Sequence, residues 1–325
     1  MNEQEVKDLL SRLNDLKAAV HQVIIGQEDV LDQMIIGLLA SGHILLEGVP
    51  GLAKTLMIQS LSKALDFSFK RIQFTPDLMP SDILGTEILQ EDDQGKRFFK
   101  YAPGPVFTHM LLADEINRTP PKTQSALLEL MQEYKVTYAG KTYSLPKPFF
   151  LLATQNPIEQ SGTFPLPEAQ VDRFLIHIKV AYPTASEEEQ ILEATTGSIK
   201  KQVPVVYSAD EIIKMQELCR EVHIDKELLS GVSRLIRSTR PHETAVTEVN
   251  QYVDWGAGPR AGQALILTAK AHALLQGRFS VIPADIKKMA IPTLRHRVIL
   301  NFAATSEKID VVDIIHACLK HNNIG

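Results

Sequence analysis

The sequence has few cysteines, no long apolar run and no excess of basic residues. Its two cysteines, Cys219 and Cys318, are far apart and make neither a CxxC motif nor a disulfide framework. The longest apolar stretch, residues 34–46, is too short for a transmembrane helix and includes the polar His43. The opening residues lack a basic segment followed by an apolar core, so we expect no signal peptide.

The charge balance is slightly acidic, because 39 Asp and Glu residues against 34 Lys and Arg residues give a formal net charge of −5. This balance argues against a general binder of nucleic acid or of anionic membranes. Hydrophobic residues make up 44% and charged residues 22% of the 325 residues, as in ordinary globular proteins of about two domains. We therefore expect a soluble, cytoplasmic protein with no membrane span.

Short apolar runs alternate with helical patterns, which is typical of a parallel sheet covered by helices on both faces. The runs that predict five strands are residues 44–46, 69–74, 110–113, 149–153 and 174–180. Apolar residues at three- and four-residue steps from Leu9 to Val23 predict an opening helix, and a second helical pattern follows Gly26. Segments 86–101 and 135–144 contain turn residues between apolar strands, so we predict two hairpins, the second turning at Ala139 and Gly140.

The strand patterns stop after about residue 183. Ser186–Glu189 and Ser208–Glu211 match the capping-box pattern that opens helices. Further helices are predicted around residues 228–236, 261–275 and 284–290. We therefore predict an α/β domain over residues 1–183 and an all-helical domain over residues 184–325.

A glycine-rich segment, Gly48–Thr55, directly follows the first predicted strand and precedes a helical pattern. It resembles the phosphate-binding loop G-x-x-x-x-G-K-[ST], except that Ala53 replaces the second glycine. Lys54 would contact the β- and γ-phosphates and Thr55 would bind Mg²⁺; the alternative is a turn with an incidental surface lysine. The residues predicted to bind the nucleotide here are Gly48, Pro50, Gly51, Leu52, Ala53, Lys54, Thr55 and Leu56.

Two carboxylates, Asp114 and Glu115, end the apolar strand at residues 110–113. The carboxyl ends of strands are where ligands of open α/β folds bind. Asp114 would hold the Mg²⁺ shell, and Glu115 would orient and polarise the water that attacks ATP. Alone, this pattern usually means a strand that ends at a polar loop. About sixty residues after a phosphate-binding loop, it favours ATP hydrolysis.

Three further polar residues stand at positions where they could act on the nucleotide. Asn156 follows the strand at 149–153, where it could hydrogen-bond the attacking water, although a turn before proline is the usual role. Arg173 directly precedes the last predicted strand. Arg260 follows Pro259 at a helix start, where a nearby phosphate would explain a positive charge. An ordinary surface ion pair is the alternative for both arginines.

Segments 48–55, 112–132 and 152–174, together with Gly258–Ala261 and Leu294–Arg297, resemble the MoxR family of AAA+ ATPases over nearly the full chain. The resemblance implies an α/β AAA+ core with a helical lid, and it accepts alanine before the loop lysine.

The resemblance also implies roles for individual residues. Asn156 is implied to be the sensor-1 residue and Arg260 the sensor-2 residue of the lid. Arg173 matches the arginine finger that acts on a neighbour's ATP, with Arg118 as a second candidate. Ile25, Gly26 and Gln27 form the stretch that lies along the adenine. The two hairpins resemble inserts that magnesium chelatase and the replicative MCM helicases share.

The family resemblance implies a homo-oligomeric, hexameric ring that hydrolyses ATP with Mg²⁺ and remodels client proteins. Chaperone-like maturation, including metal-cofactor insertion, and partners with von Willebrand factor A domains are part of that expectation. Two alternatives are a nucleotide-gated switch with little turnover and a DNA-dependent motor. Glu115 disfavours the switch, because binding alone needs no water-polarising carboxylate. The acidic charge and the lack of a DNA-binding motif disfavour nucleic acid as a partner.

Two weaker patterns have ordinary explanations. Tyr138, Lys141 and Tyr143 on the second hairpin would face a central pore or stabilise the hairpin across its strands. His316, Cys318 and His321 lack a fourth ligand and the spacing of a zinc site, so we expect a helix end with two surface histidines.

Overall fold

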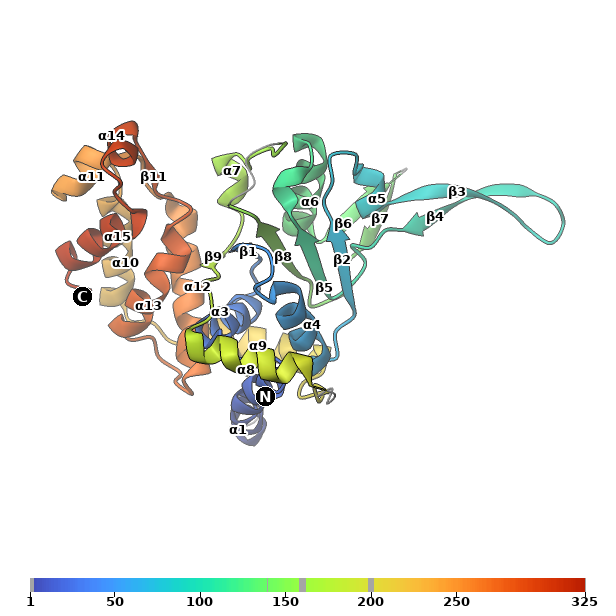
Figure 1. Ribbon diagram of the computed structural model, residues 1–325, viewed down its shortest axis with the longest axis horizontal. Helices are drawn as coiled ribbons and strands as arrows, with labels where there is room; N and C mark the ends of the chain where they lie inside the picture. Colours follow the sequence, from blue (N-terminus) through green and yellow to red (C-terminus); the bar gives the residue numbers. More distant parts are fainter. Residues whose placement is uncertain (1–2, 139, 158–161, 198–201, 325) are drawn as a thin grey trace.

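The structure is a computed structural model that describes residues 3–138, 140–157, 162–197 and 202–324. A five-stranded parallel sheet in the order β2-β5-β8-β1-β9 forms the centre of its α/β part, as predicted (Figure 1). Its strands are β1 (Ile44–Glu47), β2 (Phe69–Gln73), β5 (Met110–Asp114), β8 (Phe150–Gln155) and β9 (Ile176–Lys179).

Both faces of the sheet are buried, which explains why its strands are continuous apolar runs. Successive side chains point to opposite faces, so Leu45 and Leu111 pack with residues of α6, whereas Ile44 and Leu112 pack with residues of α3 and α4. The helices up to residue 171 are α1 (Glu3–Ser11), α2 (Leu13–His21), α3 (Glu28–Leu39), α4 (Lys54–Ala64), α5 (Pro80–Leu84), the 3₁₀ helix η1 (Ile116–Arg118), α6 (Pro121–Glu133) and α7 (Glu168–Val171).

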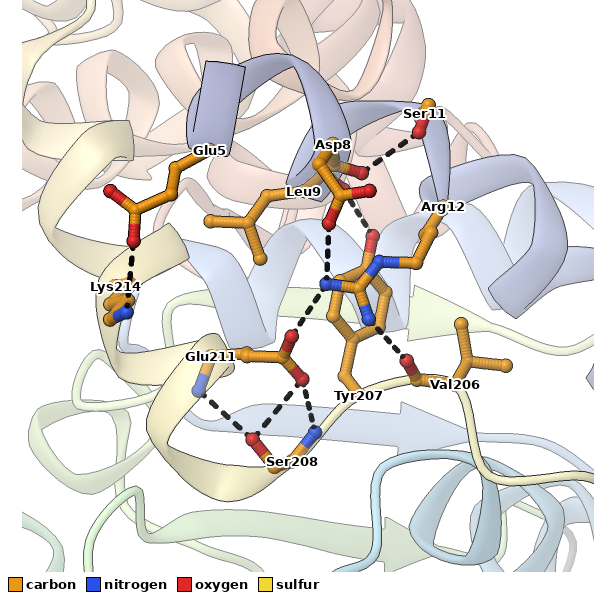
Figure 2. A network of polar contacts seen from close by, with 10 residues as sticks. All are labelled: Glu5, Asp8, Leu9, Ser11, Arg12, Val206, Tyr207, Ser208, Glu211 and Lys214. Carbon is orange, nitrogen blue, oxygen red and sulfur yellow. Dashed lines mark hydrogen bonds and ion pairs between the residues drawn. The ribbon is translucent and has the colours of Figure 1, made fainter. Parts of the chain in front are cut away.

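The opening helix predicted from Leu9 to Val23 is two helices, α1 and α2, which meet at Arg12. Figure 2 shows that the Arg12 side chain contacts segment 206–211, which is far away in the sequence. Its guanidinium donates to the Val206 carbonyl oxygen at 2.9 Å and to Glu211 Oε1 at 2.5 Å, and lies 4.8 Å from the centroid of the Tyr207 ring. These contacts attach the first two helices to the start of α9 (Ala209–Glu221).

We expect Arg12→Ala to lower the free energy of unfolding by about 1–3 kcal/mol, because it removes charge-assisted hydrogen bonds from a partly buried site. Urea unfolding followed by circular dichroism measures this change. Lys7→Ala is the matched control: its ion pair with Glu3 is well exposed on α1 and should contribute less than about 1 kcal/mol. Equal effects of the two substitutions would contradict the structural role given to Arg12.

Both predicted hairpins are present. The first, β3 (Gly85–Glu91) and β4 (Arg97–Pro103), projects far from the body of the molecule (Figure 1). The second is β6 (Lys135–Tyr138) and β7 (Lys141–Ser144); Ala139, at its predicted turn, lies outside the described residues.

Tyr138 and Tyr143 of the second hairpin stack on Tyr101 of the first. The centroid distances to the Tyr101 ring are 5.4 Å for Tyr138 and 4.4 Å for Tyr143. These contacts give both rings a packing role between the hairpins, and a location at a central pore stays a prediction.

The chain after residue 183 is mainly helical, and the helices from α10 onward lie together at one side of the molecule (Figure 1). It also contains the short strands β10 (Val253–Trp255) and β11 (Ile299–Leu300), so the prediction of an all-helical domain was wrong in this respect. Strands of two or three residues are too short to produce a detectable hydrophobic periodicity. The remaining helices are α8 (Ala185–Thr196), α10 (Lys226–Ser238), α11 (Thr247–Tyr252), α12 (Pro259–Leu275), α13 (Pro283–Leu294), α14 (Phe302–Ser306) and α15 (Val311–His321).

One of the two predicted capping boxes is correct and the other is wrong. Ser208 and Glu211 cap α9 as expected. Helix α8 is capped by Thr184 and Glu187, two residues before the predicted Ser186–Glu189. The domain boundary between residues 183 and 184 stays a prediction. No helix among the described residues has the length and apolar character needed to cross a bilayer.

Candidate functional site

The loop between β1 and α4 has a tight backbone with two residues in the left-handed region. Gly51 has φ +89° and Ala53 has φ +55°. Glycine adopts this conformation without a steric cost. For Ala53, which has a Cβ, the left-handed conformation costs about 1–2 kcal/mol. A Cβ on Gly51 would meet no atom within 4 Å among the described residues, so the loop is open on that side.

The start of α4 fits an anion. Helix α4 begins at Lys54, and its N-terminus has neither a capping side chain nor an acidic residue in the first turn. The backbone N–H groups and the dipole of such a helix end favour negative charge. The Lys54 ammonium donates to the Gly48 carbonyl oxygen, which folds the side chain back over the loop. Burial lowers the pKa of Lys54, whereas the nearby Asp114 and Glu115 raise it.

Asp114 is oriented on both of its carboxylate oxygens. The Thr154 hydroxyl donates to Oδ1 at 2.5 Å, and Arg71 donates to Oδ2 through Nε at 2.9 Å and Nη2 at 2.6 Å. Asp114 is 9% exposed at the end of β5, and Thr55 lies half-buried in the first turn of α4. A carboxylate and a hydroxyl are the oxygen ligands that Mg²⁺ prefers, so these residue types fit the ion.

Glu115 follows directly and has φ +57°, which turns the chain sharply after the strand. Its backbone N–H donates to the Thr154 hydroxyl at 2.8 Å, so Thr154 contacts both acidic residues. Its carboxylate accepts from Gln73 Nε2 at 2.8 Å and pairs with Arg118 Nε at 2.9 Å. Arg118 therefore contacts Glu115 of its own chain.

Asn156 and the predicted adenine segment lie near the same edge of the sheet. The Gly48 N–H donates to the carbonyl oxygen of residue 155 at 3.3 Å, which places the buried Asn156 next to the start of the loop. Gln27 Nε2 donates to the Ala181 carbonyl oxygen at 2.9 Å, just beyond β9. Gly26 has φ +66°, and a Cβ there would lie 2.1 Å from a Glu187 carboxylate oxygen, so Ile25 and Gly26 pass close to the start of α8.

The structure does not bring Arg173 and Arg260 to this group. Arg173 precedes β9, and the N–H of Leu175 donates to the His43 carbonyl oxygen at the amino end of β1. From residue 43 to Gly48 the extended chain covers about 16 Å. Arg260, at the start of α12, donates at 3.1 Å to Asp172, which is the residue next to Arg173 in the chain.

Sequence reasoning missed Arg71, Gln73 and Thr154, which orient the two acidic residues. Arg71 and Gln73 are two residues apart on β2. This spacing puts both side chains on one face of a strand that pairs with β5. Thr154 stands two residues before Asn156 at the polar end of an otherwise apolar strand, and its hydroxyl is the signal that could have found it.

No three His, Cys, Asp or Glu side chains in the described part of the chain are grouped so that they could hold a metal ion. Cys318 is buried, with its sulfur 3.6 Å from the Ser238 carbonyl oxygen, and burial raises the pKa of its thiol to about 11. The thiol is therefore a packing group of the C-terminal helices, and His316 and His321 are exposed.

Comparisons with known proteins give the family of the chain. Residues 43–176 match the ATPase family associated with various cellular activities (AAA), and residues 245–318 match the AAA lid domain. The chain is 42% identical to Chaperone MoxR1 of Mycobacterium tuberculosis over 96% of its own length and 83% of that protein.

A more distant relative and a solved structure indicate the same family. Protein MoxR of Paracoccus denitrificans is 28% identical over 92% of each chain. A crystal structure of a Cytophaga hutchinsonii protein superimposes with a TM-score of 0.92 at 42% identity, covering 98% of this chain and 96% of that one. The chain therefore belongs to the MoxR family of AAA+ ATPases.

Proposed function

We propose that this protein binds and hydrolyses ATP with Mg²⁺, and that it uses the reaction to remodel or mature client proteins as a chaperone. The observation that carries the proposal is the convergence of Lys54, Asp114 and Glu115 at the uncapped start of α4. A cation and a helix N-terminus suit the phosphates, while two carboxylates beside them suit a metal ion and a water molecule.

Each group has a defined task in this proposal. Lys54 exchanges its bond to the Gly48 carbonyl oxygen for phosphate oxygens. Thr55 and Asp114 would hold Mg²⁺, which when bound neutralises charge on the phosphates. Glu115 orients the attacking water, and Asn156 hydrogen-bonds that water or the γ-phosphate.

The position of the two arginines supports assembly into a ring. Arg173 and the Asp172 carboxylate that binds Arg260 are adjacent in the chain before β9, remote from the loop of their own chain. We therefore propose that both arginines act on the nucleotide of a neighbouring subunit. An interface that joins two different surfaces head to tail closes into a ring when the rotation allows it. Membership of the MoxR family supports three further parts of the proposal. These are a hexameric ring in the cytoplasm, clients that receive a metal cofactor, and partners with von Willebrand factor A domains.

The switch alternative has one observation in its favour. Gln73 and Arg118 of the same chain hold the Glu115 carboxylate, which is the arrangement of a resting site. Steady-state ATP turnover of the wild-type protein decides between a hydrolase and a switch. Turnover that rises with added DNA would instead support a DNA-dependent motor.

Lys54→Ala should weaken ATP binding by about 2–5 kcal/mol, or on the order of 30- to 5,000-fold in Kd, because the phosphates lose a partly buried countercharge. Isothermal calorimetry with ATP and Mg²⁺ measures the affinity. Lys63→Ala, an exposed lysine in the last turn of the same helix, is the control and should bind as the wild type does. Unchanged affinity in Lys54→Ala would overturn the assignment of the loop.

A further inference from the structure

A buried arginine fixes the chain segment that precedes β9. Arg297 is 6% exposed and follows α13. Its guanidinium donates to the carbonyl oxygens of Asp172 at 3.0 Å, Phe174 at 2.6 Å and Leu175 at 3.1 Å. Its Nε also donates to Asp172 Oδ1 at 2.8 Å. One oxygen of the Asp172 carboxylate is therefore held in place from the buried side.

The other oxygen of the same carboxylate holds Arg260. The distance from Arg260 Nη1 to Asp172 Oδ2 is 3.1 Å, and the Arg260 side chain is 50% exposed. This is the one hydrogen bond of the Arg260 guanidinium to the described part of the chain. Because a guanidinium has five N–H donors, Arg260 can keep this bond and still present several donors to a phosphate.

Arg173 shares the anchored segment, because it is the residue after Asp172. Its Nη1 donates to the Leu128 carbonyl oxygen on α6 at 3.1 Å. The segment that Arg297 anchors thus carries Arg173 directly and Arg260 through a carboxylate. Without that carboxylate Arg260 would be a long side chain free to sample many rotamers, and ordering it on a phosphate would cost up to about 2 kcal/mol of rotamer entropy.

We propose that Asp172 is a positioning residue, which holds Arg260 beside Arg173 so that both guanidiniums meet a phosphate of the adjacent subunit's nucleotide. The inference rests on the proposed function, in which these arginines act across the subunit boundary. The competing explanation is a simple ion pair between the core and the C-terminal helices. Such an exposed pair contributes about 0–1 kcal/mol to stability and nothing specific to the reaction.

Asp172→Asn separates the two contacts of the carboxylate. Its amide oxygen can still accept from Arg297 Nε, whereas its NH₂ group cannot accept from Arg260. We expect kcat to fall on the order of 10- to 100-fold with KM nearly unchanged, because a displaced catalytic group costs about that much. Arg260→Ala should show a similar loss, and the double variant should lose no more than Arg260→Ala alone, since the two residues act as one unit.

Asp172→Glu covers the case in which the asparagine variant does not fold. It keeps the negative charge for the buried Arg297 but moves the carboxylate by one methylene, so we expect a folded protein with reduced kcat. Thermal unfolding reports the fold separately. Native kcat in folded Asp172→Glu, or losses that multiply in the double variant with Arg260→Ala, would overturn the inference.

Mixed rings test the positioning role across the boundary. Rings that contain Asp172→Asn and Glu115→Gln subunits should regain activity where an intact Glu115 meets an intact Asp172 of the neighbour. A lack of recovery in rings shown by native mass spectrometry to be mixed would contradict the inference. If the wild-type protein itself hydrolyses no ATP, the proposed function fails too, so the two failures are distinguishable.

Discussion

Glu115→Gln is expected to bind ATP and Mg²⁺ as the wild type does and to lose turnover, with kcat lower on the order of 10²- to 10⁴-fold. The amide has the shape of the carboxylate but cannot polarise water as a base, and general base catalysis contributes about that factor. The backbone bond from residue 115 to the Thr154 hydroxyl does not involve the side chain, so the turn after β5 should persist. Calorimetry gives the affinity, and phosphate release gives the rate.

Two further variants make this result specific. Glu129→Gln changes an exposed glutamate on α6 in the same way and should keep the native rate. Asp114→Asn should instead raise the Mg²⁺ concentration that gives half the maximal rate, because the proposed metal ligand loses its charge. A Glu115→Gln protein that turns over ATP at the native rate would move the catalytic role elsewhere and strengthen the switch alternative.

The sheet and the loop could be predicted because their signals are local. Strands buried on both faces are short apolar runs, and Gly48–Thr55 stands between one such run and a helical pattern. Ala53 departs from the usual loop pattern, and its left-handed φ shows that the backbone shape is kept at a cost in strain. The sequence pattern of strand, loop and helix was therefore enough to predict that Asp114 and Glu115 lie at the carboxyl end of the sheet strands, on the side of the loop.

The contacts that orient these groups could not be predicted in the same way. Arg12 reaches Glu211 and Asp172 binds Arg260 across long stretches of sequence, and no periodicity records which surface arginine meets which carboxylate. The start of α8 shows a local form of the same problem. Thr184 and Ser186 each precede a glutamate by three residues, so the capping-box pattern fits both. Thr184 is the cap because its backbone is extended and its side-chain oxygen accepts from the Glu187 N–H, whereas Ser186 already lies within the helix.

Arg173→Ala should leave ATP binding nearly intact while it suppresses hydrolysis, on the order of 10³-fold or more. An arginine supplied by a neighbour neutralises charge that develops on the γ-phosphate, and in well-studied nucleotide hydrolases this effect is worth about 10³–10⁵ in rate. The substitution also removes the bond to the Leu128 carbonyl oxygen, so thermal unfolding should be recorded for each variant. Arg234→Ala, an exposed arginine on α10 that bonds to Ser230, is the matched control and should keep the native rate.

A mixing experiment tests whether Arg173 acts across the boundary between subunits. Arg173→Ala and Glu115→Gln subunits should each be inactive alone, because every site lacks either the arginine or the carboxylate. In a mixed ring, some sites pair an intact Glu115 with an intact Arg173 from the neighbour, and these sites should hydrolyse ATP. No recovery in rings proven to be mixed by native mass spectrometry would count against a role in trans. Rings of Arg118→Ala alone then test the second candidate: if Arg118 only holds Glu115 of its own chain, these rings should hydrolyse ATP without a second variant.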